Sequence, residues 1–314
     1  MARWPTLEGA VQSIVGPARL RVDAPLARLT TFRVGGPADL LVEVHTVEEL
    51  RAVLAAARRV DAPVTMLGGG SNVLIADAGV RGVVVRLKLL GLEQPAPDIV
   101  RAGAGATMNG LVRWTIGRGL AALEAWAGTP GTVGGAIYGN AHYGGRNIGD
   151  LVSRVQLMSR DGVTTDVSAA EMEFAYDTSR LQRSRELLVW AEFRVTMGGP
   201  DALRATARAS LAHRKRTQPL DVPSAGCIFQ NPDSARDQLP DGVPASAGAL
   251  IDRAGLKGHR IGGAMISTAH ANFIVNDHGA TASDIHALIE TARRAVRERF
   301  GVELRDEVVR MGEH

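Results

Sequence analysis

The chain has 314 residues and a formal net charge of +3, from 36 basic and 33 acidic side chains. This small net charge and an aromatic content of 4% argue against a nucleic-acid-binding surface. One cysteine excludes an intramolecular disulfide framework, and the sequence shows neither a secretory leader nor an apolar run of about 18 residues. We therefore expect a cytoplasmic protein with no membrane span and no nucleic-acid partner.

The first half of the chain predicts strands that alternate with helices. The predicted elements are strands at 40–44, 62–67, 82–87 and 98–103, a helix capped by Thr46 with Glu49, and a helix capped by Thr107 that ends near Gly119. This alternation of the two hydrophobic periods is typical of a mixed α and β fold.

The second half has a strand-rich part and then a helical part. Strands are predicted at 151–159, 163–168 and 187–195, a linker at 198–200, a basic helix at 201–216, and a last helix from Thr281 to Gly301. The pattern indicates an α+β chain with a nucleotide-binding half and a second unit after about residue 200.

Two glycine-rich stretches indicate a ligand that lies close to bare backbone. "LGGGSNVLIAD" (67–77) follows a predicted strand, so its backbone N–H groups could converge on phosphate oxygens. No Lys-Ser or Lys-Thr follows at the spacing of a P-loop. "AGTPGTVGGAIYGNA" (127–141) suits a flat ligand with amide groups at its polar edge. A plain tight turn also explains the first stretch alone, whereas the second is harder to explain as turns. A long cofactor such as FAD would use both stretches.

The only cysteine, Cys227, stands in "SAGCIFQNP" (224–232). One interpretation is a small buried hydrophobic residue, since free cysteine is often buried. The other is a reactive acid or nucleophile. The residues around Cys227 do not decide between these two interpretations.

Five motifs in order resemble those of the UDP-N-acetylenolpyruvoylglucosamine reductase (MurB) family of flavoenzymes. They are "LGGGSNVLIADAGVRGVVVRL", "GTPGTVGGAIYGNA", "SAGCIFQNP", "GLKGHRIGGAMISTAHANFIVN" and "GVELRDEVVRMG". The resemblance implies an FAD-binding fold of the vanillyl-alcohol-oxidase (PCMH) type, made of two subdomains, with a C-terminal α+β substrate-binding domain. The domain limits we expect are 1–84, 85–199, 200–300 and a C-terminal segment 301–314 that carries a catalytic Glu.

The resemblance also implies a reaction in peptidoglycan precursor synthesis. NADPH would reduce FAD, and hydride would then pass to UDP-N-acetylglucosamine enolpyruvate to give UDP-N-acetylmuramate. The residues implied for noncovalent FAD binding are Gly68, Gly69, Gly70, Ser71, Asn72, Thr129, Pro130, Gly131, Gly134, Gly135 and Asn140. Ser71 and Asn72 stand where covalent flavoproteins of this fold often have a flavin-linked His, so a noncovalent cofactor is expected.

The implied catalytic residues are Cys227, Glu307 and Arg180. Cys227 occupies the position at which the family usually has a proton-donating serine, and a thiol is a much stronger acid than an alcohol. Glu307 matches a carboxylate that assists proton handling. The family pattern Tyr-Arg-x-Ser becomes Tyr-Asp-x-Ser here, with Asp177 in place of the arginine. We expect Asp177 to point away or pair with an arginine, and Arg180 to take the missing charge, unless it is only a surface residue.

The substrate-binding residues implied are Arg214, Arg216 and Asn231, and no metal site is expected. An arginine in "HRKRTQP" (213–219) suits the UDP pyrophosphate, although basic residues there also complement a helix C-terminus. Gln230 replaces the usual family lysine, so one positive charge is missing. Two alternatives stay open, another FAD-linked sugar oxidoreductase of the same fold and a cysteine-dependent hydrolase that pairs Cys227 with His213 or His270. A monomer is expected.

Overall fold

The computed structural model describes residues 4–233, 236, 237, 239 and 242–313. Backbone contacts divide the chain into two compact units, and each unit is assembled from separate stretches of sequence. The first unit comprises Met1–Ala24, Asp39–Gly69 and Arg81–His213; the second comprises Pro25–Ala38, Gly70–Val80 and Arg214–His314. Each unit has its own apolar core.

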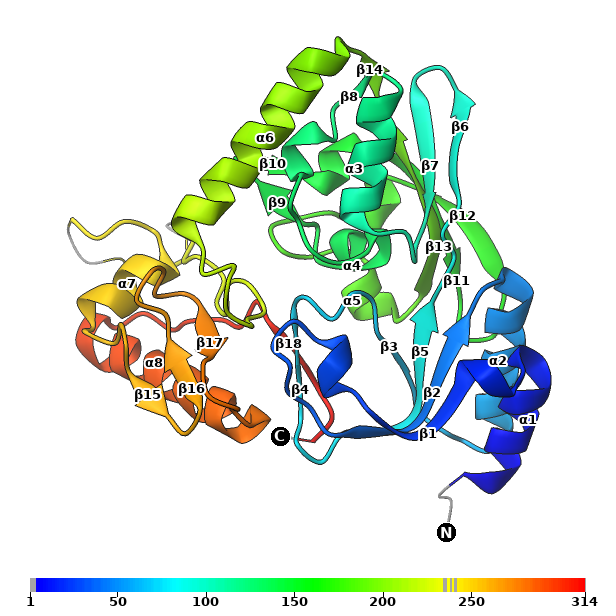
Figure 1. The fold of residues 1–314 in the computed structure, drawn as a ribbon, viewed down its shortest axis with the longest axis horizontal. Helices are drawn as coiled ribbons and strands as arrows, with labels where there is room; N and C mark the ends of the chain where they lie inside the picture. Colours follow the sequence, from blue (N-terminus) through cyan, green and yellow to red (C-terminus); the bar gives the residue numbers. More distant parts are fainter. Residues whose placement is uncertain (1–3, 234–235, 238, 240–241, 314) are drawn as a thin grey trace. The chain divides into compact units, whose positions relative to one another are not determined.

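The first unit contains a four-stranded sheet in the order β1-β2-β5-β3. Its strands are β1 (Leu20–Pro25), β2 (Pro37–Val44), β5 (Val80–Leu87) and β3 (Val64–Met66). Helices α1 (Pro5–Val15) and α2 (Val47–Arg59) lie side by side (Figure 1) and share a buried core with β2 and β5. The sequence predicted β2 and α2, whereas α1 and β1 were not predicted.

The N-terminus of α2 differs in one detail from the predicted capping box. Thr46 accepts a hydrogen bond from the amide of Glu49 at 3.1 Å, as expected of an N-cap. The carboxylate of Glu49 instead accepts from the amide of His45 at 2.8 Å and pairs with both terminal nitrogens of Arg19. A charged partner 30 residues away therefore competes with the local box.

The second sheet of the first unit has the order β12-β11-β13-β7-β6 and is antiparallel throughout. Its strands are β12 (Thr164–Ser168), β11 (Val152–Met158), β13 (Leu187–Arg194), β7 (Ile99–Gly103) and β6 (Leu92–Ala96). Helices α3 (Met108–Gly117) and α4 (Val133–Tyr138) pack with it around a core that includes Trp126 and Phe193. Thr107 caps α3 as predicted, accepting from the amide of Gly110 at 3.0 Å.

Shorter elements complete the first unit. They are the strand pair β8 (Leu120–Ala121) with β14 (Thr196–Met197), the pair β9 (His142–Tyr143) with β10 (Arg146–Asn147), helix α5 (Leu181–Ser184), and 3₁₀ segments at Pro17–Arg19, Glu124–Trp126, Ile148–Leu151 and Ala170–Met172. The predicted basic helix is α6 (Pro200–Thr217), and the division between the units falls within it, after His213.

The second unit combines the C-terminal residues with two short earlier stretches. Strand β4 (Val73–Ile75) pairs in parallel with β18 (Val309–Met311), and a 3₁₀ segment lies at Ala27–Leu29. An antiparallel sheet of β15 (Arg260–Ile261), β16 (Ala264–Ile266) and β17 (Ile274–Asn276) packs with α7 (Ala247–Arg253) and α8 (Ala282–Phe300). Pairing of β4 with β18 joins the end of the first glycine-rich loop to the C-terminal strand.

Helix α8 has both predicted ends and one contact that no local pattern indicates. Thr281 and Asp284 form a reciprocal capping box, and Gly301 ends the helix with a φ of 70°. In addition, the carboxylate of Asp77 accepts from the amides of Ala282 and Ser283 at 2.8 and 2.9 Å. An acidic group at a helix N-terminus is stabilising, so Asp77 contributes to the stability of α8 in the second unit.

Candidate active site

The first glycine-rich loop presents a row of backbone donors. Among the described residues, the amides of Gly68, Gly69, Gly70 and Ser71 donate to no protein acceptor. Gly70 has a φ of 65°, and a Cβ there would overlap the carbonyl of Leu29, so only glycine fits. Successive unbonded N–H groups in a bend form a concavity for phosphate oxygens. The loop therefore fits a pyrophosphate such as that of FAD.

The second glycine-rich stretch is fixed by its own backbone and touches the first. Val133 and Gly134 donate to carbonyls that follow β7, at 2.8 and 2.9 Å. A Cβ on Gly69 would lie 2.5 Å from the Cα of Gly131, so the two loops meet backbone to backbone. Side chains at this contact would force the loops apart. The structure thus brings together two stretches that are about sixty residues apart in the sequence.

Residues around α4 have different environments. Thr129 is half-buried and Pro130 exposed in the turn before the helix, and Gly135 is exposed within it. Asn140 is only 2% exposed. Its carboxamide accepts from the amide of Gly149 at 2.9 Å and donates to the carbonyl of Ala175 at 2.8 Å. Asn140 therefore ties the end of the glycine-rich stretch to the segment that contains Asp177.

Within the part of the chain that the structure describes, Asp177 pairs with a histidine and not with an arginine, in contrast to one of the two expectations from the sequence. It is buried, and its Oδ1 lies 3.0 Å from Nδ1 of His142. The ring of His142 also lies 5.2 Å from that of Tyr176. The imidazole therefore lies where an arginine was expected, while Oδ2 of Asp177 is buried without a hydrogen-bond partner among the described residues.

Arg180 lies close to Asp177 in the chain but has a separate partner. Its Nε and Nη2 donate to the two carboxylate oxygens of Glu186 at 2.9 and 3.2 Å. The side chain is about one third exposed. Within the described residues Nη1 makes no hydrogen bond, so one side of the guanidinium can still meet an anion.

Cys227 is half-buried, so its thiol lies neither fully inside the core nor fully in solvent. Gly226 before it has a φ of 80°, and the two residues after it, Ile228 and Phe229, are buried. The buried pair anchors the segment that carries Cys227.

The C-terminal segment that carries Glu307 pairs with the Cys227 segment. The amides of Glu307 and Val308 donate to the carbonyl of Ile228 at 2.8 and 3.2 Å, and the amide of Gln230 donates to the carbonyl of Arg305 at 2.9 Å. Phe229 and Asp306 form an antiparallel bridge between the same two segments. Residues 227 and 307 therefore lie in two paired segments, although they are 80 positions apart in the sequence.

The end of the first glycine-rich loop also reaches this C-terminal segment. Asn72 donates from Nδ2 to the carbonyl of Glu307 at 3.0 Å, and its own carbonyl accepts from the amide of Val309 at 3.0 Å. The side-chain Oδ1 of Asn72 is buried without a hydrogen-bond partner. The structure thus places a predicted cofactor residue and a predicted catalytic residue next to each other.

Asn272 is a site residue that the sequence did not single out. It is 3% exposed, and its carboxamide bonds both the N–H and the C=O of Phe229, at 3.0 and 2.8 Å. Its backbone carbonyl accepts from Ile228 at 2.9 Å. The signal available in the sequence was a polar residue next to the apolar run of "STAHANFIVN", because a polar side chain that is buried there needs hydrogen-bond partners. Burial, followed by the charge of Lys257, lowers the pKa of the neighbouring His270.

The predicted substrate-binding residues differ in exposure. Arg214 is 7% exposed, whereas Arg216, two positions later on α6, is exposed. Asn231 accepts from the amide of Ala247 at 3.1 Å through its side-chain oxygen. Within the described ranges, no helix is long and apolar enough to cross a membrane, and no group of three or more His, Cys, Asp or Glu could hold a metal ion.

The fold and the glycine-rich loops define an FAD-binding oxidoreductase with a separate C-terminal domain. Residues 38–168 match the model of the FAD binding domain, and residues 218–311 match that of the C-terminal domain of UDP-N-acetylenolpyruvoylglucosamine reductase. The expected fold, a vanillyl-alcohol-oxidase-type FAD-binding fold followed by an α+β C-terminal domain, is confirmed.

Whole-chain relatives then give the family. The chain is 38% identical over 305 residues to UDP-N-acetylenolpyruvoylglucosamine reductase 1 of Bacillus anthracis, covering 96% of this chain and 97% of the relative. It is 44% identical over 292 residues to the Anaeromyxobacter dehalogenans reductase, covering 93% and 85%. The crystal structure of the MurB reductase from Thermus caldophilus matches with a TM-score of 0.77 and 33% identity, over 93% of this chain and all of that one. The chain belongs to the UDP-N-acetylenolpyruvoylglucosamine reductase family.

Proposed function

We propose that this enzyme reduces UDP-N-acetylglucosamine enolpyruvate to UDP-N-acetylmuramate, with NADPH as reductant and FAD bound noncovalently. The observation that carries the proposal is the pairing of residues 228–230 with 305–308, which holds the segments of Cys227 and Glu307 together in a chain of this family. The family favours this reaction over a cysteine-dependent hydrolase, which would leave both glycine-rich loops without a role.

FAD would be held by the backbone donors of Gly68 to Ser71 and by the adjoining stretch 128–135. Bound there, it supplies hydride transfer, from NADPH to the enolpyruvyl carbon. The chain itself supplies the shape of the cradle, since the contact of Gly69 with Gly131 leaves no room for side chains. Asn72 ends the loop, and its side chain connects the loop to the backbone of Glu307, one of the two residues proposed to handle the proton.

Cys227 would donate the proton that completes the reduction. Hydride addition to one alkene carbon leaves an enol or enolate beside the substrate carboxylate, and the neighbouring carbon must then receive a proton. The thiol of a half-buried residue on a fixed backbone is a suitable donor, since a thiol is a stronger acid than an alcohol. Glu307, in the segment paired with residues 228–230, would assist by exchanging that proton with solvent.

Arg180 would stabilise the developing negative charge in the place of the missing arginine at position 177. Support comes from its ion pair with Glu186, which fixes the guanidinium through Nε and Nη2 and leaves Nη1 for an anion. Asp177 does not compete for this arginine, because His142 is its partner.

The UDP part of the substrate would bind near the end of α6 and near Asn231. Arg214 and Arg216 are both candidates for the pyrophosphate, and guanidinium groups suit its paired oxygens. The burial of Arg214 favours a strong contact, while the exposure of Arg216 favours access. Asn231, already oriented by the amide of Ala247, would contact the sugar nucleotide.

A spectrum and a steady-state assay test the proposal together. The purified protein should show flavin absorbance, and acid should release the flavin because no covalent link holds it. NADPH oxidation should depend on the enolpyruvyl substrate. A colourless protein, or NADPH oxidation that is indifferent to that substrate, would contradict the proposal.

A further inference from the structure

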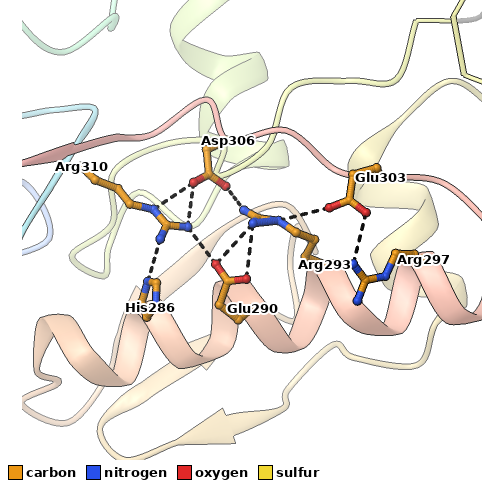
Figure 2. A network of polar contacts seen from close by, with 7 residues as sticks. All are labelled: His286, Glu290, Arg293, Arg297, Glu303, Asp306 and Arg310. Atoms are coloured by element: carbon orange, nitrogen blue, oxygen red, sulfur yellow. Dashed lines mark hydrogen bonds and ion pairs between the residues drawn. The ribbon is translucent and has the colours of Figure 1, made fainter. Parts of the chain in front are cut away.

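Seven charged or titratable side chains join the C-terminal segment to helix α8 (Figure 2). They are His286, Glu290, Arg293 and Arg297 from α8, and Glu303, Asp306 and Arg310 from the segment that follows it. The network lies wholly within the second unit, beside the residues that pair with the Cys227 segment.

Asp306 is the centre of this network. Its Oδ1 accepts from Nη2 of Arg293, and its Oδ2 accepts from Nε of Arg310 at 2.9 Å (Figure 2). Both arginines also bind Glu290 on α8, at 3.3 and 2.9 Å. Arg310 further donates to Nδ1 of His286 at 2.9 Å, since a guanidinium can only donate. Asp306 thus accepts hydrogen bonds from two arginines. Arg293 belongs to α8, and Arg310 is held by side chains of α8.

The backbone at Asp306 is the same backbone that holds the two proposed proton-handling residues. Asp306 bridges Phe229, and its neighbour Glu307 donates to the carbonyl of Ile228. Arg293 adds a second tie, because its guanidinium carbon lies 5.7 Å from the centre of the Phe229 ring. A side chain fixed at position 306 therefore constrains both of the paired segments, 228–230 and 305–308.

The network is stronger than an isolated surface ion pair. A single exposed pair contributes little, but charge-assisted bonds that share partners in a network are held in one geometry. Asp306 and Arg293 are also well covered, with side chains 23% and 19% exposed, whereas Glu303 at the network's edge is 52% exposed. Glu303 contacts Arg293 and Arg297 only at 4.0 and 3.7 Å.

We infer that Asp306, held by Arg293 and Arg310, is a positioning residue that sets the geometry of Glu307 relative to Cys227. This inference rests on the proposed function, in which these two residues handle the proton. Asp306 acts through the backbone and through its two arginines. Small displacements of a donor are costly, because proton transfer requires close approach of the reacting atoms.

The test compares Asp306→Asn with the matched control Glu303→Gln, using the full-length protein with its flavin bound. Both changes replace a carboxylate of the network by an amide of the same shape. Hydrogen exchange should accelerate at the amides of Gln230, Glu307 and Val308 in Asp306→Asn. Exchange in the β16–β17 pair should be unchanged, and Glu303→Gln should match the wild type throughout.

The kinetic readout separates positioning from a general loss of stability. Reduction of the flavin by NADPH should keep its wild-type rate in Asp306→Asn, while reoxidation by the enolpyruvyl substrate should slow by about tenfold or more. Asp306→Glu, which keeps the charge, should recover part of that rate. Should Asp306→Asn fail to fold, Arg310→Gln removes the contact on one side only and is measured in the same way.

Two outcomes would overturn the inference, and each is distinct from a failure of the proposed function. Asp306→Asn could behave like Glu303→Gln in both exchange and reoxidation, or it could slow flavin reduction as much as reoxidation. The reoxidation rate of Cys227→Ala is measured alongside, as the reference for loss of the proposed proton donor. If Cys227→Ala itself reoxidises at the wild-type rate, the proposed proton donor is wrong, and the exchange data still decide the role of Asp306.

Discussion

Two regions of the molecule carry the proposed catalytic residues, and they are organised in opposite ways. In the segment 175–186, side chains are fixed by other side chains, as in the pairs Asp177 with His142 and Arg180 with Glu186. In the segment 227–230, the backbone is fixed, by Asn272 on one side and by residues 305–308 on the other. The thiol of Cys227 is left half-buried.

The difference agrees with the roles proposed for the two groups. A proton donor has to change its protonation state, so a rigid backbone with an accessible side chain serves it well. A stabilising cation keeps its charge throughout, and a carboxylate partner can fix its orientation in advance. Substitutions should therefore act on one half-reaction in the 227–230 region and more broadly in the 175–186 region.

The largest effect is expected at Cys227. Cys227→Ala should leave flavin reduction by NADPH near its normal rate but slow reoxidation by the enolpyruvyl substrate about 10²–10⁴-fold, the usual cost of losing a general acid. Cys227→Ser should recover much of the activity. Stopped-flow absorbance of the flavin measures both half-reactions. Normal turnover by Cys227→Ala would return Cys227 to the interpretation of a packing residue.

Arg180→Ala should lower kcat about 10²-fold, as expected for the loss of a group that stabilises charge in the transition state. The matched control is Arg183→Ala. Arg183 is also paired with a glutamate but is 61% exposed, so its loss should change kcat by less than about threefold. Steady-state kinetics on both variants make the comparison. Equal effects of the two substitutions would move the charge-stabilising role away from Arg180.

Gly69→Val tests the proposed FAD cradle. A Cβ at this position would lie 2.5 Å from the Cα of Gly131, so the loops should separate and flavin occupancy should fall to a small fraction of the wild-type value. Gly91→Val is the control, because a Cβ on Gly91 meets nothing within 4 Å. The ratio of flavin to protein absorbance, with circular dichroism to check folding, measures the effect. Full occupancy in Gly69→Val would place the phosphate elsewhere.

Arg214→Ala and Arg216→Ala should differ in KM for the UDP-sugar substrate. Loss of a charge-assisted phosphate contact should raise KM about tenfold at low salt, with a smaller change at high salt. We expect the larger effect from Arg214, because a buried contact is screened less. An unchanged KM in both variants would show that the basic end of α6 only complements the helix dipole.

The smallest effect concerns acid stability of the network that supports the 227–230 region. Burial raises the pKa of Glu290, but the hydrogen bond from Arg310 and the charges of Arg293 and Arg310 outweigh it and lower the pKa below 4.5. A carboxyl whose pKa is lower in the folded state adds stability above pH 4.5, and that stability is lost as the pH falls through the lowered value. Urea unfolding from about pH 6 to about pH 3 should therefore be less pH-dependent in Glu290→Gln. An unaltered pH dependence would show that Glu290 adds no such stability.

The sequence by itself determined the local elements and the class of protein. Hydrophobic periodicity and the caps Thr107 and Thr281 predicted strands and helices that the structure contains, because these signals act within a few residues. The order of the five motifs was enough to indicate the family, which the whole-chain relatives confirm. Their glycines also indicated where the backbone must come close to a ligand.

Only the tertiary structure decided which side chains meet. No local pattern in the sequence predicts the partners of Asp177 and Arg180. The same is true of the pairing of residues 228–230 with 305–308 and of the capping of α8 by Asp77. A charge in a sequence shows that a partner is needed, but many residues of opposite sign could supply it. The packing of sheets and helices selects the partner. A buried charge needs a partner close in space, whatever the distance between the two residues along the chain.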